Sequence, residues 1–373
     1  MAKPCDVLII GGGVIGLTTA YFLARQGISV TVTDAGDFGR ESSWAGAGIL
    51  SPGHPRRARS ALGRLRALSA SLFPQLSQDL LEKTGVHNGY WVCGGLELRR
   101  SADALEKQRI ENLMREEQGE GASCEVLDGE QLRQRQPGIA EDLPGAVYFP
   151  EMAQVRNPWH IRALVAACQL YKVNLRPYDP VVELVREGEQ IVGVWTPQER
   201  LVADKFIVCA GAWTDRLLRS LGLSFGIRPM RGQIVLLRCS MPILRHIIMG
   251  GDEYLVPRPD GRILVGSTVE DAGYDKRTTA EAIAHLLATA CRWVPALSHA
   301  EVERCWAGLR PGNPDGRPFI GSVPNYRNLY IASGHFRSGL TLSPGTAQVL
   351  MELILGLPLS VPIEAFAVER LAA

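Results

Sequence analysis

Residues 7–34 read VLIIGGGVIGLTTAYFLARQGISVTVTD, and this stretch decides the fold. Residues 7–10 are all apolar, which is typical of a strand buried on both faces of a parallel sheet. Residues 17–27 carry apolar side chains at helical spacing and stop at a glycine, and residues 28–33 read as a second strand. The stretch therefore predicts a βαβ unit.

Three glycines follow the first strand in the pattern Gly11-x-Gly13-x-x-Gly16. Gly11 allows a tight turn, Gly13 lets the backbone approach a pyrophosphate, and Gly16 lets the helix pack closely on the strand. The helix N-terminus adds a positive partial charge. Asp34 closes the second strand and would accept hydrogen bonds from a ribose diol. Without a nearby arginine it disfavours the 2′-phosphate of NADP. The motif predicts a dinucleotide site, and a glycine turn without a ligand is the alternative.

The composition excludes several classes of protein. The 373 residues predict about two domains. Hydrophobic residues make up 46% and charged residues 21%, which argues against a disordered chain. Lys plus Arg number 40 and Asp plus Glu number 39, so the net charge is +1. Proteins that hold nucleic acid electrostatically usually have a basic excess, so we expect no nucleic-acid partner.

The eight cysteines are scattered and include no C-x-x-C pair, so we expect neither a metal site nor a disulfide framework. Unpaired cysteines fit a reducing compartment. The chain enters its first strand without room for a signal peptide and has no run of about 18 apolar residues, which a spanning helix needs. We therefore expect a cytoplasmic protein that does not enter a membrane.

Later segments alternate between helix and strand patterns. Helical spacing predicts helices at about 55–83, 102–118, 159–171, 278–293 and 345–355. A hairpin is expected around Gly188, and residues 231–269 read as strands of an antiparallel sheet with a turn at Asp260 and Gly261. Because no linker separates these segments, we expect interleaved domains.

Further spacing favours FAD over NAD. Ala20 and Gly27 stand where FAD-dependent reductases and oxidases carry matching residues. A strand also runs into Gly211, and residues 334–341 form a loop that leads into a helix. That loop would place backbone N–H groups near the pyrimidine end of a flavin.

With these motifs, the chain resembles the D-amino acid oxidase superfamily, in the branch of the glycine oxidases (thiamine-biosynthesis type) and sarcosine oxidases. The matching segments are the N-terminal fingerprint, SSWAGAGIL (42–50), RNP (156–158), CAGAW (209–213), YLVPR (254–258), VGST (265–268), WAGLRP (306–311), DGRP (315–318) and GHFR (334–337). They run from residue 5 to about residue 355, which is nearly the whole chain.

The resemblance implies an α/β fold, α+β overall, in which a Rossmann-like FAD-binding domain joins an antiparallel-sheet substrate-binding domain. The FAD-binding domain is predicted at 1–85, 150–225 and 306–373, and the substrate-binding domain at 86–149 and 226–305. Sarcosine oxidases anchor flavin through a cysteine that residues 316–324 lack, so non-covalent FAD is predicted. Relatives are commonly homotetramers, so a homo-oligomer is expected.

The resemblance also assigns substrate-binding residues. Arg310 matches the arginine that clamps the substrate carboxylate in a bidentate fashion, which a lysine does not do. Tyr254 matches a tyrosine that hydrogen-bonds the same carboxylate, and Arg337 matches a second active-site arginine. The alternatives are that Arg310 pairs with a protein carboxylate, that Tyr254 is an ordinary sheet residue, and that Arg337 serves the flavin. Asp252 is a candidate to reach the pocket, and a shorter side chain at Val269 would admit a bulkier substituent.

Cofactor contacts are likewise implied by the resemblance. Val182 would offer backbone hydrogen bonds to adenine, residues 46–48 would pass close to the isoalloxazine ring, and His335 would be structural rather than a base. The predicted FAD-binding residues are Gly11, Gly13, Val14, Ile15, Gly16, Asp34, Ser42, Ser43, Gly46, Ala47, Gly48, Val182, Ala210, Gly211, Trp213, Gly308, Gly334, His335, Arg337, Ser338, Gly339, Leu340 and Thr341.

The predicted reaction is oxidative deamination of glycine or a related small amine, such as sarcosine, an N-substituted glycine or a small D-amino acid. Hydride transfer to flavin would give a 2-oxo acid and ammonia or an amine, with oxygen reduced to hydrogen peroxide. Three alternatives stay open. They are a dehydrogenase that passes electrons to a quinone or carrier with the basic 56–66 segment at a membrane, an enzyme acting on a modified tRNA base, and a flavin-binding protein without turnover.

Overall fold

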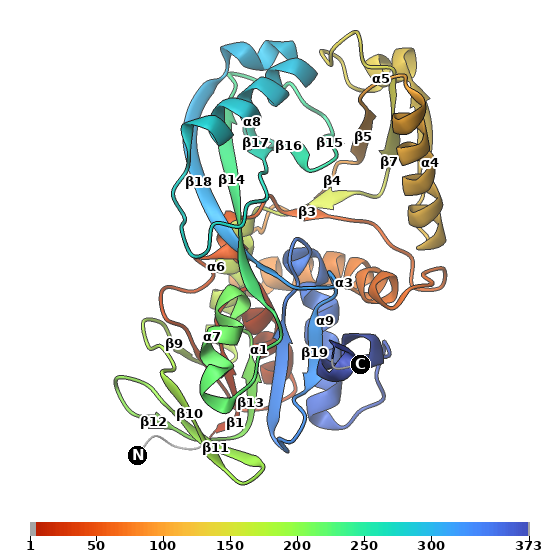
Figure 1. The fold of residues 1–373 in the computed structure, drawn as a ribbon. Helices are drawn as coiled ribbons and strands as arrows, with labels where there is room; N and C mark the ends of the chain where they lie inside the picture. Colours follow the sequence, from red (N-terminus) through yellow and green to blue (C-terminus); the bar gives the residue numbers. More distant parts are fainter. Residues whose placement is uncertain (1–4, 372–373) are drawn as a thin grey trace.

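The predicted βαβ unit forms the centre of a six-stranded sheet in the computed structural model, which describes residues 5–371 (Figure 1). The strand order is β19-β20-β13-β1-β2-β9, and all neighbours are parallel except β19 and β20. The strands are β1 (Cys5–Ile10), β2 (Val30–Thr33), β9 (Asn174–Arg176), β13 (Ala203–Val208), β19 (Phe319–Ser322) and β20 (Leu329–Ser333). The predicted Rossmann-like unit is confirmed.

Both faces of this sheet are covered, which explains the unbroken apolar run of β1. Successive side chains of a strand point to opposite faces, and Val7 and Ile9 pack in one core while Leu8 and Ile10 pack in another. The first core involves helices α1 (Val14–Arg25), α3 (Ala61–Thr84), α6 (Asn157–Leu170) and α9 (Gly339–Leu355). The second involves a small antiparallel sheet of β10 (Glu183–Glu187), β11 (Gln190–Trp195) and β12 (Arg200–Leu201), which contains the hairpin expected around Gly188.

A second, eight-stranded sheet has the order β18-β14-β17-β16-β15-β5-β7-β6. It is antiparallel as predicted, apart from the parallel pair of β15 and β5. Its strands are β5 (Gly95–Arg99), β6 (Glu125–Asp128), β7 (Gly145–Phe149), β14 (Arg228–Arg238), β15 (Ile247–Gly250), β16 (Glu253–Pro257), β17 (Arg262–Gly266) and β18 (Glu301–Gly312). Helix α8 (Ala280–Trp293) packs on it through Leu286, Ala290 and Trp293.

Shorter elements connect the two sheets and flank the second one. Helices α4 (Ala104–Gly119) and α5 (Gly129–Arg135) lie beside β5 and β7 (Figure 1). A three-stranded sheet is formed by β3 (Ile49–Leu50), β8 (Ala153–Gln154) and β4 (Trp91–Val92). The remaining helices are α2 (Ser42–Ala45) and α7 (Thr214–Leu218).

Strands β14 and β18 run between the two parts of the molecule. They pair along their whole length, from Arg228 opposite Gly312 to Arg238 opposite Glu301, and Figure 1 shows both extending from the eight-stranded sheet toward the six-stranded sheet. The domain boundary predicted at 305/306 therefore falls inside β18. The division into domains stays a prediction, and its residues 1–4 and 372–373 lie outside the described residues.

Two helices begin at other positions than predicted. Helix α9 starts at Gly339 instead of 345 and contains Pro344. Pro344 has no N–H to donate to the carbonyl of Leu340, four residues before it. The Ser343 hydroxyl donates to that carbonyl instead, at 2.9 Å. Helix α3 starts at Ala61 instead of 55, because Ser60 caps it by accepting the N–H of Gly63 at 2.9 Å.

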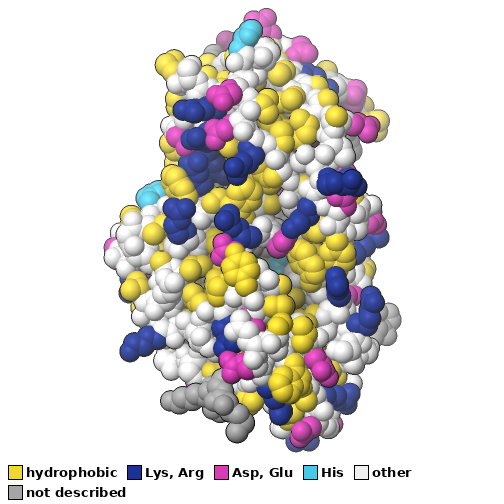
Figure 2. All heavy atoms as spheres, turned by 90° about the vertical axis from the view of Figure 1, so that its left-hand side faces the viewer, with side chains coloured by type: hydrophobic (Ala, Val, Ile, Leu, Met, Phe, Trp, Pro, Cys, Tyr) yellow, Lys and Arg dark blue, Asp and Glu magenta, His cyan; other side chains and the backbone are white. Residues whose placement is uncertain are grey.

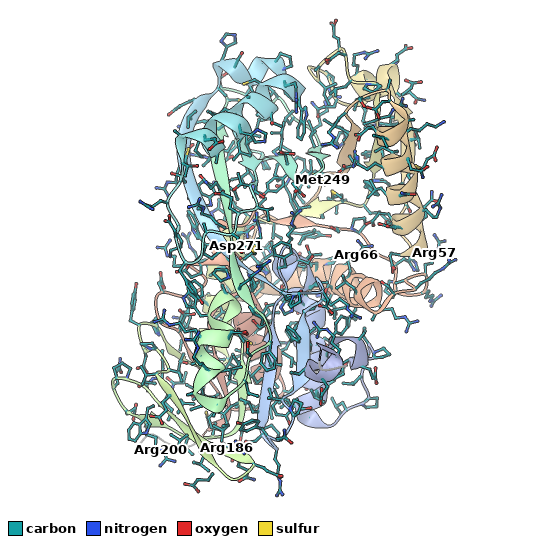
Figure 3. The ribbon with its side chains drawn as sticks, viewed as in Figure 1. Arg57, Arg66, Arg186, Arg200, Met249 and Asp271 are labelled. Carbon is teal, nitrogen blue, oxygen red and sulfur yellow. The ribbon has the colours of Figure 1, made fainter. Side chains whose placement is uncertain are left out.

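The basic segment before and within α3 packs against α4. The Arg66 guanidinium pairs with Glu117 at 3.0 Å, and the N–H groups of Arg59 and Ser60 each donate to Glu120 at 3.2 Å. Figure 3 shows Arg57 and Arg66 at this end of α3, near the foot of α4. Within residues 5–371, no helix combines the length and the hydropathy needed to cross a membrane.

Candidate functional site

A cleft of about 1290 Å³ runs from the carboxyl ends of β1 and β2 to the turn between β15 and β16. Nearly all of the predicted FAD-binding residues line it, and so do Arg310, Tyr254 and Arg337. Gly16 and Gly334 do not line it. Residues far apart in the sequence thus meet at one continuous surface, which supports the resemblance that grouped them.

The glycine turn brings strand and helix into close contact. Gly11 has φ +111°, and a Cβ there would overlap the carbonyl oxygen of Cys209. A Cβ on Gly16 would overlap the Gly11 carbonyl, so Gly16 serves packing beneath the cleft, as its position in the motif predicts. The N-terminus of α1 lines the cleft. Gly13 offers no capping side chain, and the Val14 N–H donates to Ser43 Oγ at 2.9 Å. Such an end attracts phosphate.

Asp34 holds this turn and lines the cleft beside it. Its two carboxylate oxygens accept the N–H of Gly12 at 2.7 Å and of Gly36 at 2.9 Å. Burial raises the pKa of Asp34, while these two N–H groups lower it. Carboxylate oxygens have further lone pairs for ribose hydroxyls. Arg40, which was not singled out from the sequence, also lines the cleft and pairs with Asp37 at 3.2 Å.

The cleft contains polar atoms and close backbone approaches that fit a large polar cofactor. Within residues 5–371, Thr33 Oγ1 and Asn157 Oδ1 are buried without a hydrogen-bond partner, and both residues line the cleft. Buried polar groups usually have a partner, so both atoms fit a ligand. A Cβ on Gly46 would lie 3.0 Å from Asn157 Nδ2, and one on Gly308 would lie 2.5 Å from Ala45 Cβ. The RNP motif gave no role for Asn157, which also donates to the Ser43 carbonyl at 2.6 Å.

Arg310 lies on β18 at the other end of the cleft. Its Nη1 donates to the Thr268 carbonyl at 3.0 Å and its Nη2 to Ser267 Oγ at 2.6 Å. Neither partner is a carboxylate, so these bonds orient the guanidinium without neutralising it. A Cβ on Gly232 would overlap the guanidinium, so this glycine makes room for it. Burial lowers the pKa of Arg310 and the charge of Arg337 lowers it further, while Tyr254 and Asp252 raise it. All four residues line the same cleft.

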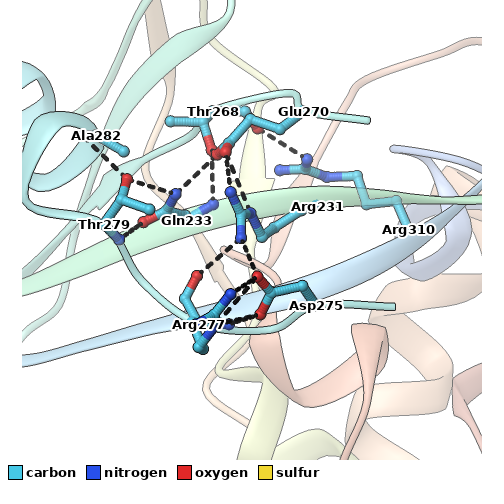
Figure 4. A network of polar contacts seen from close by, with 9 residues as sticks. All are labelled: Arg231, Gln233, Thr268, Glu270, Asp275, Arg277, Thr279, Ala282 and Arg310. Carbon is cyan, nitrogen blue, oxygen red and sulfur yellow. Dashed lines mark hydrogen bonds and ion pairs between the residues drawn. The ribbon is translucent and has the colours of Figure 1, made fainter. Parts of the chain in front are cut away.

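A polar network fixes the loop that holds Arg310 (Figure 4). Thr268 Oγ1 donates to Glu270 Oε1 at 2.5 Å, and Gln233 Nε2 donates to the same oxygen at 2.8 Å. Arg231 Nη2 pairs with Glu270 Oε2 at 2.5 Å. Because each group has several partners, the Thr268 carbonyl is held in place for Arg310.

Tyr254 and Arg337 come from different elements and line the same cleft. Tyr254, on β16, covers Gly266, where a Cβ would lie 2.7 Å from its ring. Arg337 precedes α9, and its Nη1 pairs with Asp252 Oδ1 at 2.7 Å. The side chain expected to face flavin or substrate is thus engaged by an acid. Asp252 lines the cleft, as its place near Tyr254 suggested.

His335 and Trp306 each have a hydrogen-bond partner within the protein. Nε2 of His335 lies 3.1 Å from Thr346 Oγ1, and burial lowers the pKa of His335 to about 3, so the imidazole is neutral at physiological pH. Trp306 Nε1 donates to the Ala45 carbonyl at 3.1 Å. Among residues 5–371, no group of three or more His, Cys, Asp and Glu side chains is arranged to hold a metal ion.

Two predicted contacts need correction. Val269 does not line the cleft, whereas Met249 does. Met249 pairs with Tyr254 across β15 and β16. The register of these two strands is the signal that could have identified Met249 as a lining residue. Val182 lines the cleft, but its N–H donates to the Trp195 carbonyl at 2.9 Å. That N–H is therefore not free to donate to adenine.

Basic and acidic side chains are intermixed on the face shown in Figure 2, so this face does not suggest a second binding site for a ligand of a single charge. The candidate site is thus the cleft between the two sheets. Its nucleotide end has a glycine turn, an open helix N-terminus and an acid, and its other end has a guanidinium beside a phenol. These groups can hold a dinucleotide and a small carboxylate next to each other.

Comparison with known proteins agrees with this geometry. Residues 6–353 match the DAO family, described as FAD dependent oxidoreductase. The chain is 40% identical to a glycine oxidase of Pseudomonas putida KT2440 over 94% of each chain. The crystal structure of glycine oxidase from Geobacillus kaustophilus has a TM-score of 0.92 at 30% identity and covers 99% of each chain.

A further solved structure extends the range of relatives. The crystal structure of iminodiacetate oxidase from Chelativorans sp. BNC1 has a TM-score of 0.86 at 27% identity, covering 97% of this chain and 98% of that one. The fold class predicted from the sequence is therefore confirmed, and FAD is the cofactor. The chain belongs to the DAO family of FAD-dependent oxidoreductases, in which it is of the glycine oxidase type.

Proposed function

We propose that the protein oxidatively deaminates glycine or a closely related small amine, such as sarcosine, an N-substituted glycine or a small D-amino acid. The observation that carries this proposal is the guanidinium of Arg310, which lies half-buried at the end of the cleft and is bonded to a carbonyl and a hydroxyl. A cation held without a bonded carboxylate favours an anionic ligand. The carboxylate of an amino acid is the matching group.

Arg310 and Tyr254 would hold that carboxylate. A guanidinium has five N–H donors in a planar fork, and only two of those of Arg310 are used by Thr268 and Ser267. The remaining donors suit the two oxygens of a carboxylate. The network through Glu270 fixes this fork before substrate arrives, so little ordering is needed on binding.

The cofactor would lie along the rest of the cleft, non-covalently bound. The open N-terminus of α1 suits the pyrophosphate and Asp34 suits the ribose. Residues 46–48 and Gly308 leave the backbone close to the ring system, and the first residues of α9 lie in the same wall. When bound, FAD supplies the electron chemistry, because it accepts two electrons from the amine carbon and passes them to oxygen.

We expect the remaining role of the protein to be orientation of the substrate, without a side chain that acts as a base. His335 is buried and neutral with its Nε2 facing Thr346, so it is not placed to remove a proton from substrate. We infer that no side-chain base is required once the amine is neutral. The overall reaction balances as amino acid, oxygen and water giving a 2-oxo acid, ammonia or an amine, and hydrogen peroxide.

Peroxide formation by the purified yellow protein tests this proposal. The panel would contain glycine, sarcosine, longer N-alkylglycines, D-alanine and D-proline. We expect peroxide with at least one small amine. Arg310→Ala should raise KM strongly while FAD stays bound, because Arg310 contacts substrate and not the nucleotide. Loss of FAD on that substitution would contradict the site assignment, and flavin reduction without peroxide would indicate a dehydrogenase.

The organisation of the chain belongs to the same proposal. We infer an FAD-binding domain at 1–85, 150–225 and 306–373 and a substrate-binding domain at 86–149 and 226–305, with β14 and β18 crossing between them. We further infer a cytoplasmic homo-oligomer, a tetramer by resemblance to the family. Light scattering after size-exclusion chromatography tests the assembly, and a monomeric mass would contradict it.

A further inference from the structure

An ion pair spans the substrate end of the cleft. Arg337 comes from the loop before α9 and Asp252 from the turn between β15 and β16, and their Nη1 and Oδ1 atoms lie 2.7 Å apart. Both residues line the cleft. The pair thus joins two elements that are distant in sequence, directly beside the residues proposed to hold substrate.

Of the two arginines at this end of the cleft, only one is paired with a carboxylate. Arg337 is paired with Asp252, whereas the hydrogen-bond partners of Arg310 are a carbonyl and a hydroxyl. The pKa of Asp252 is lowered first by its hydrogen bond to Arg337, and the charges of Arg310 and Arg100 add to the effect, so the acid is ionised. Arg100 is itself paired with Glu106 at 3.2 Å, and a second acid, Glu253, lines the cleft with its Oε1 3.0 Å from His285 Nε2. Of the two arginines that line this end, Arg310 is therefore the one without a carboxylate partner, and it is available to a substrate anion.

We propose that Asp252 sets the charge specificity of the site. By occupying Arg337, it limits the site to amines that carry one carboxylate and an uncharged substituent, and it disfavours amines with a second acidic group. This inference rests on the proposed function, in which Arg310 holds the first carboxylate. Removing the charge of Asp252 would release Arg337 to bind a second carboxylate.

The turn that carries Asp252 is held by contacts other than this ion pair. The Gly251 N–H donates to Glu97 Oε1 at 3.2 Å, and Glu97 is buried and paired with Arg109 at 2.6 Å. A Cβ on Gly250 would lie 2.6 Å from the Trp293 ring, so the turn sits tightly against α8. Asp252→Asn should therefore change the charge without displacing the backbone.

The test compares two substrates of the same shape. Iminodiacetate has two carboxylates, and its monoamide replaces one of them with an uncharged amide. The measured quantity is the ratio of kred/Kd for iminodiacetate to that for the monoamide, from anaerobic reduction of the bound flavin in the holoenzyme. We expect the wild type to prefer the monoamide and Asp252→Asn to raise the ratio at least about tenfold, which corresponds to about 1.4 kcal/mol. The partial exposure of both partners keeps the expected effect moderate.

Two further variants isolate the cause. Asp271→Asn removes the same charge from an exposed ion pair with Arg228, outside the cleft, and should leave the ratio unchanged (Asp271 is labelled in Figure 3). The double variant Asp252→Asn with Arg337→Gln should lose the gain, because the released guanidinium is absent. A ratio that stays within about twofold in Asp252→Asn, or a gain that survives in the double variant, would overturn the inference.

A binding measurement separates this inference from the proposed function. Diglycolate and methoxyacetate have an ether oxygen in place of the amine, so they bind without being oxidised to an imine. Titration against the flavin spectrum should show that Asp252→Asn tightens diglycolate and leaves methoxyacetate nearly unchanged. Equal shifts for both ligands would overturn the inference even if sarcosine is oxidised. If no amine reduces the flavin, the proposed function fails, and the titration still decides the role of Asp252.

Discussion

At the scale of single residues, the substrate end of the cleft depends on Arg310, whose guanidinium is oriented by the Thr268 carbonyl and the Ser267 hydroxyl. Arg310 and Tyr254 meet in the cleft because the strands that carry them lie in one sheet, although the predicted domains placed the two residues apart. The ion pair of Arg337 with Asp252 joins positions that only the folded chain brings together. Val269 was misjudged because the direction of a side chain depends on strand and loop geometry, which a spacing does not contain.

Arg310→Lys tests the fork geometry of the proposed carboxylate clamp. Lysine keeps the charge but replaces a planar, bidentate donor with a single ammonium. We expect KM for the best amine to rise by about tenfold or more, consistent with loss of one charge-assisted hydrogen bond. Steady-state kinetics and the ratio of flavin to protein absorbance measure both effects. An unchanged KM would argue against the clamp, whereas FAD content should match the wild type.

At the scale of elements, strand and helix types followed from periodicity, and their ends did not. A helix was predicted from about residue 345, but α9 begins at Gly339 and includes Pro344, because Ser343 supplies the donor that the proline lacks. The lengths of β14 and β18 could not be predicted from the alternation of apolar and polar residues, because the two ends of each strand pack in different surroundings. The glycine turn was predictable in detail, because each glycine has a distinct steric task.

Gly11→Ala is expected to abolish FAD retention and to lower Tm. The new Cβ would overlap the Cys209 carbonyl at a positive φ. Gly27→Ala is the matched control. It also has a positive φ, of +81°, but nothing lies within 4 Å of its Cβ, so it should cost only about 1–2 kcal/mol and keep FAD. Thermal melts and flavin content after gel filtration measure both. Equal behaviour of the two variants would contradict the packing argument.

Glu270→Gln tests whether the loop network positions Arg310. The neutral amide loses the ion pair with Arg231 and weakens the bond from Thr268, so the Thr268 carbonyl would be less firmly held. We expect a KM several-fold higher, with kcat and FAD content nearly unchanged. Glu270 would then be a positioning residue. A fall in kcat at constant KM would instead indicate a role at the reacting atoms.

At the scale of the whole molecule, the interleaving of two sheets was predictable from a chain without linkers, and the cleft between them follows from it. The sequence could not predict how burial in the assembled core changes the pKa values of titratable side chains. His335 and His160 are examples, because burial lowers their pKa values to about 3 and about 4. Both titrate near 6.5 when unfolded, so the unfolded state binds more protons at acidic pH.

Stability should therefore fall as the pH drops below about 6.5, and the loss should continue toward the folded pKa values. For His335 alone, linkage gives a loss of about 2 kcal/mol at pH 5. His335→Gln keeps a polar partner for Thr346 and cannot titrate, so its free energy of unfolding should depend less steeply on pH. Urea titrations between pH 5 and 8 measure the slope. Identical slopes for variant and wild type would exclude this origin of acid sensitivity.

We infer that one cleft holds FAD beside a carboxylate clamp at Arg310. Anaerobic mixing of the holoenzyme with glycine or sarcosine, while the absorption of the bound flavin is followed, tests this claim. We expect the flavin band to bleach in the wild type, and Arg310→Ala to bind FAD but to bleach only at far higher amine concentration. Equal bleaching of both proteins at the same concentrations would contradict the claim.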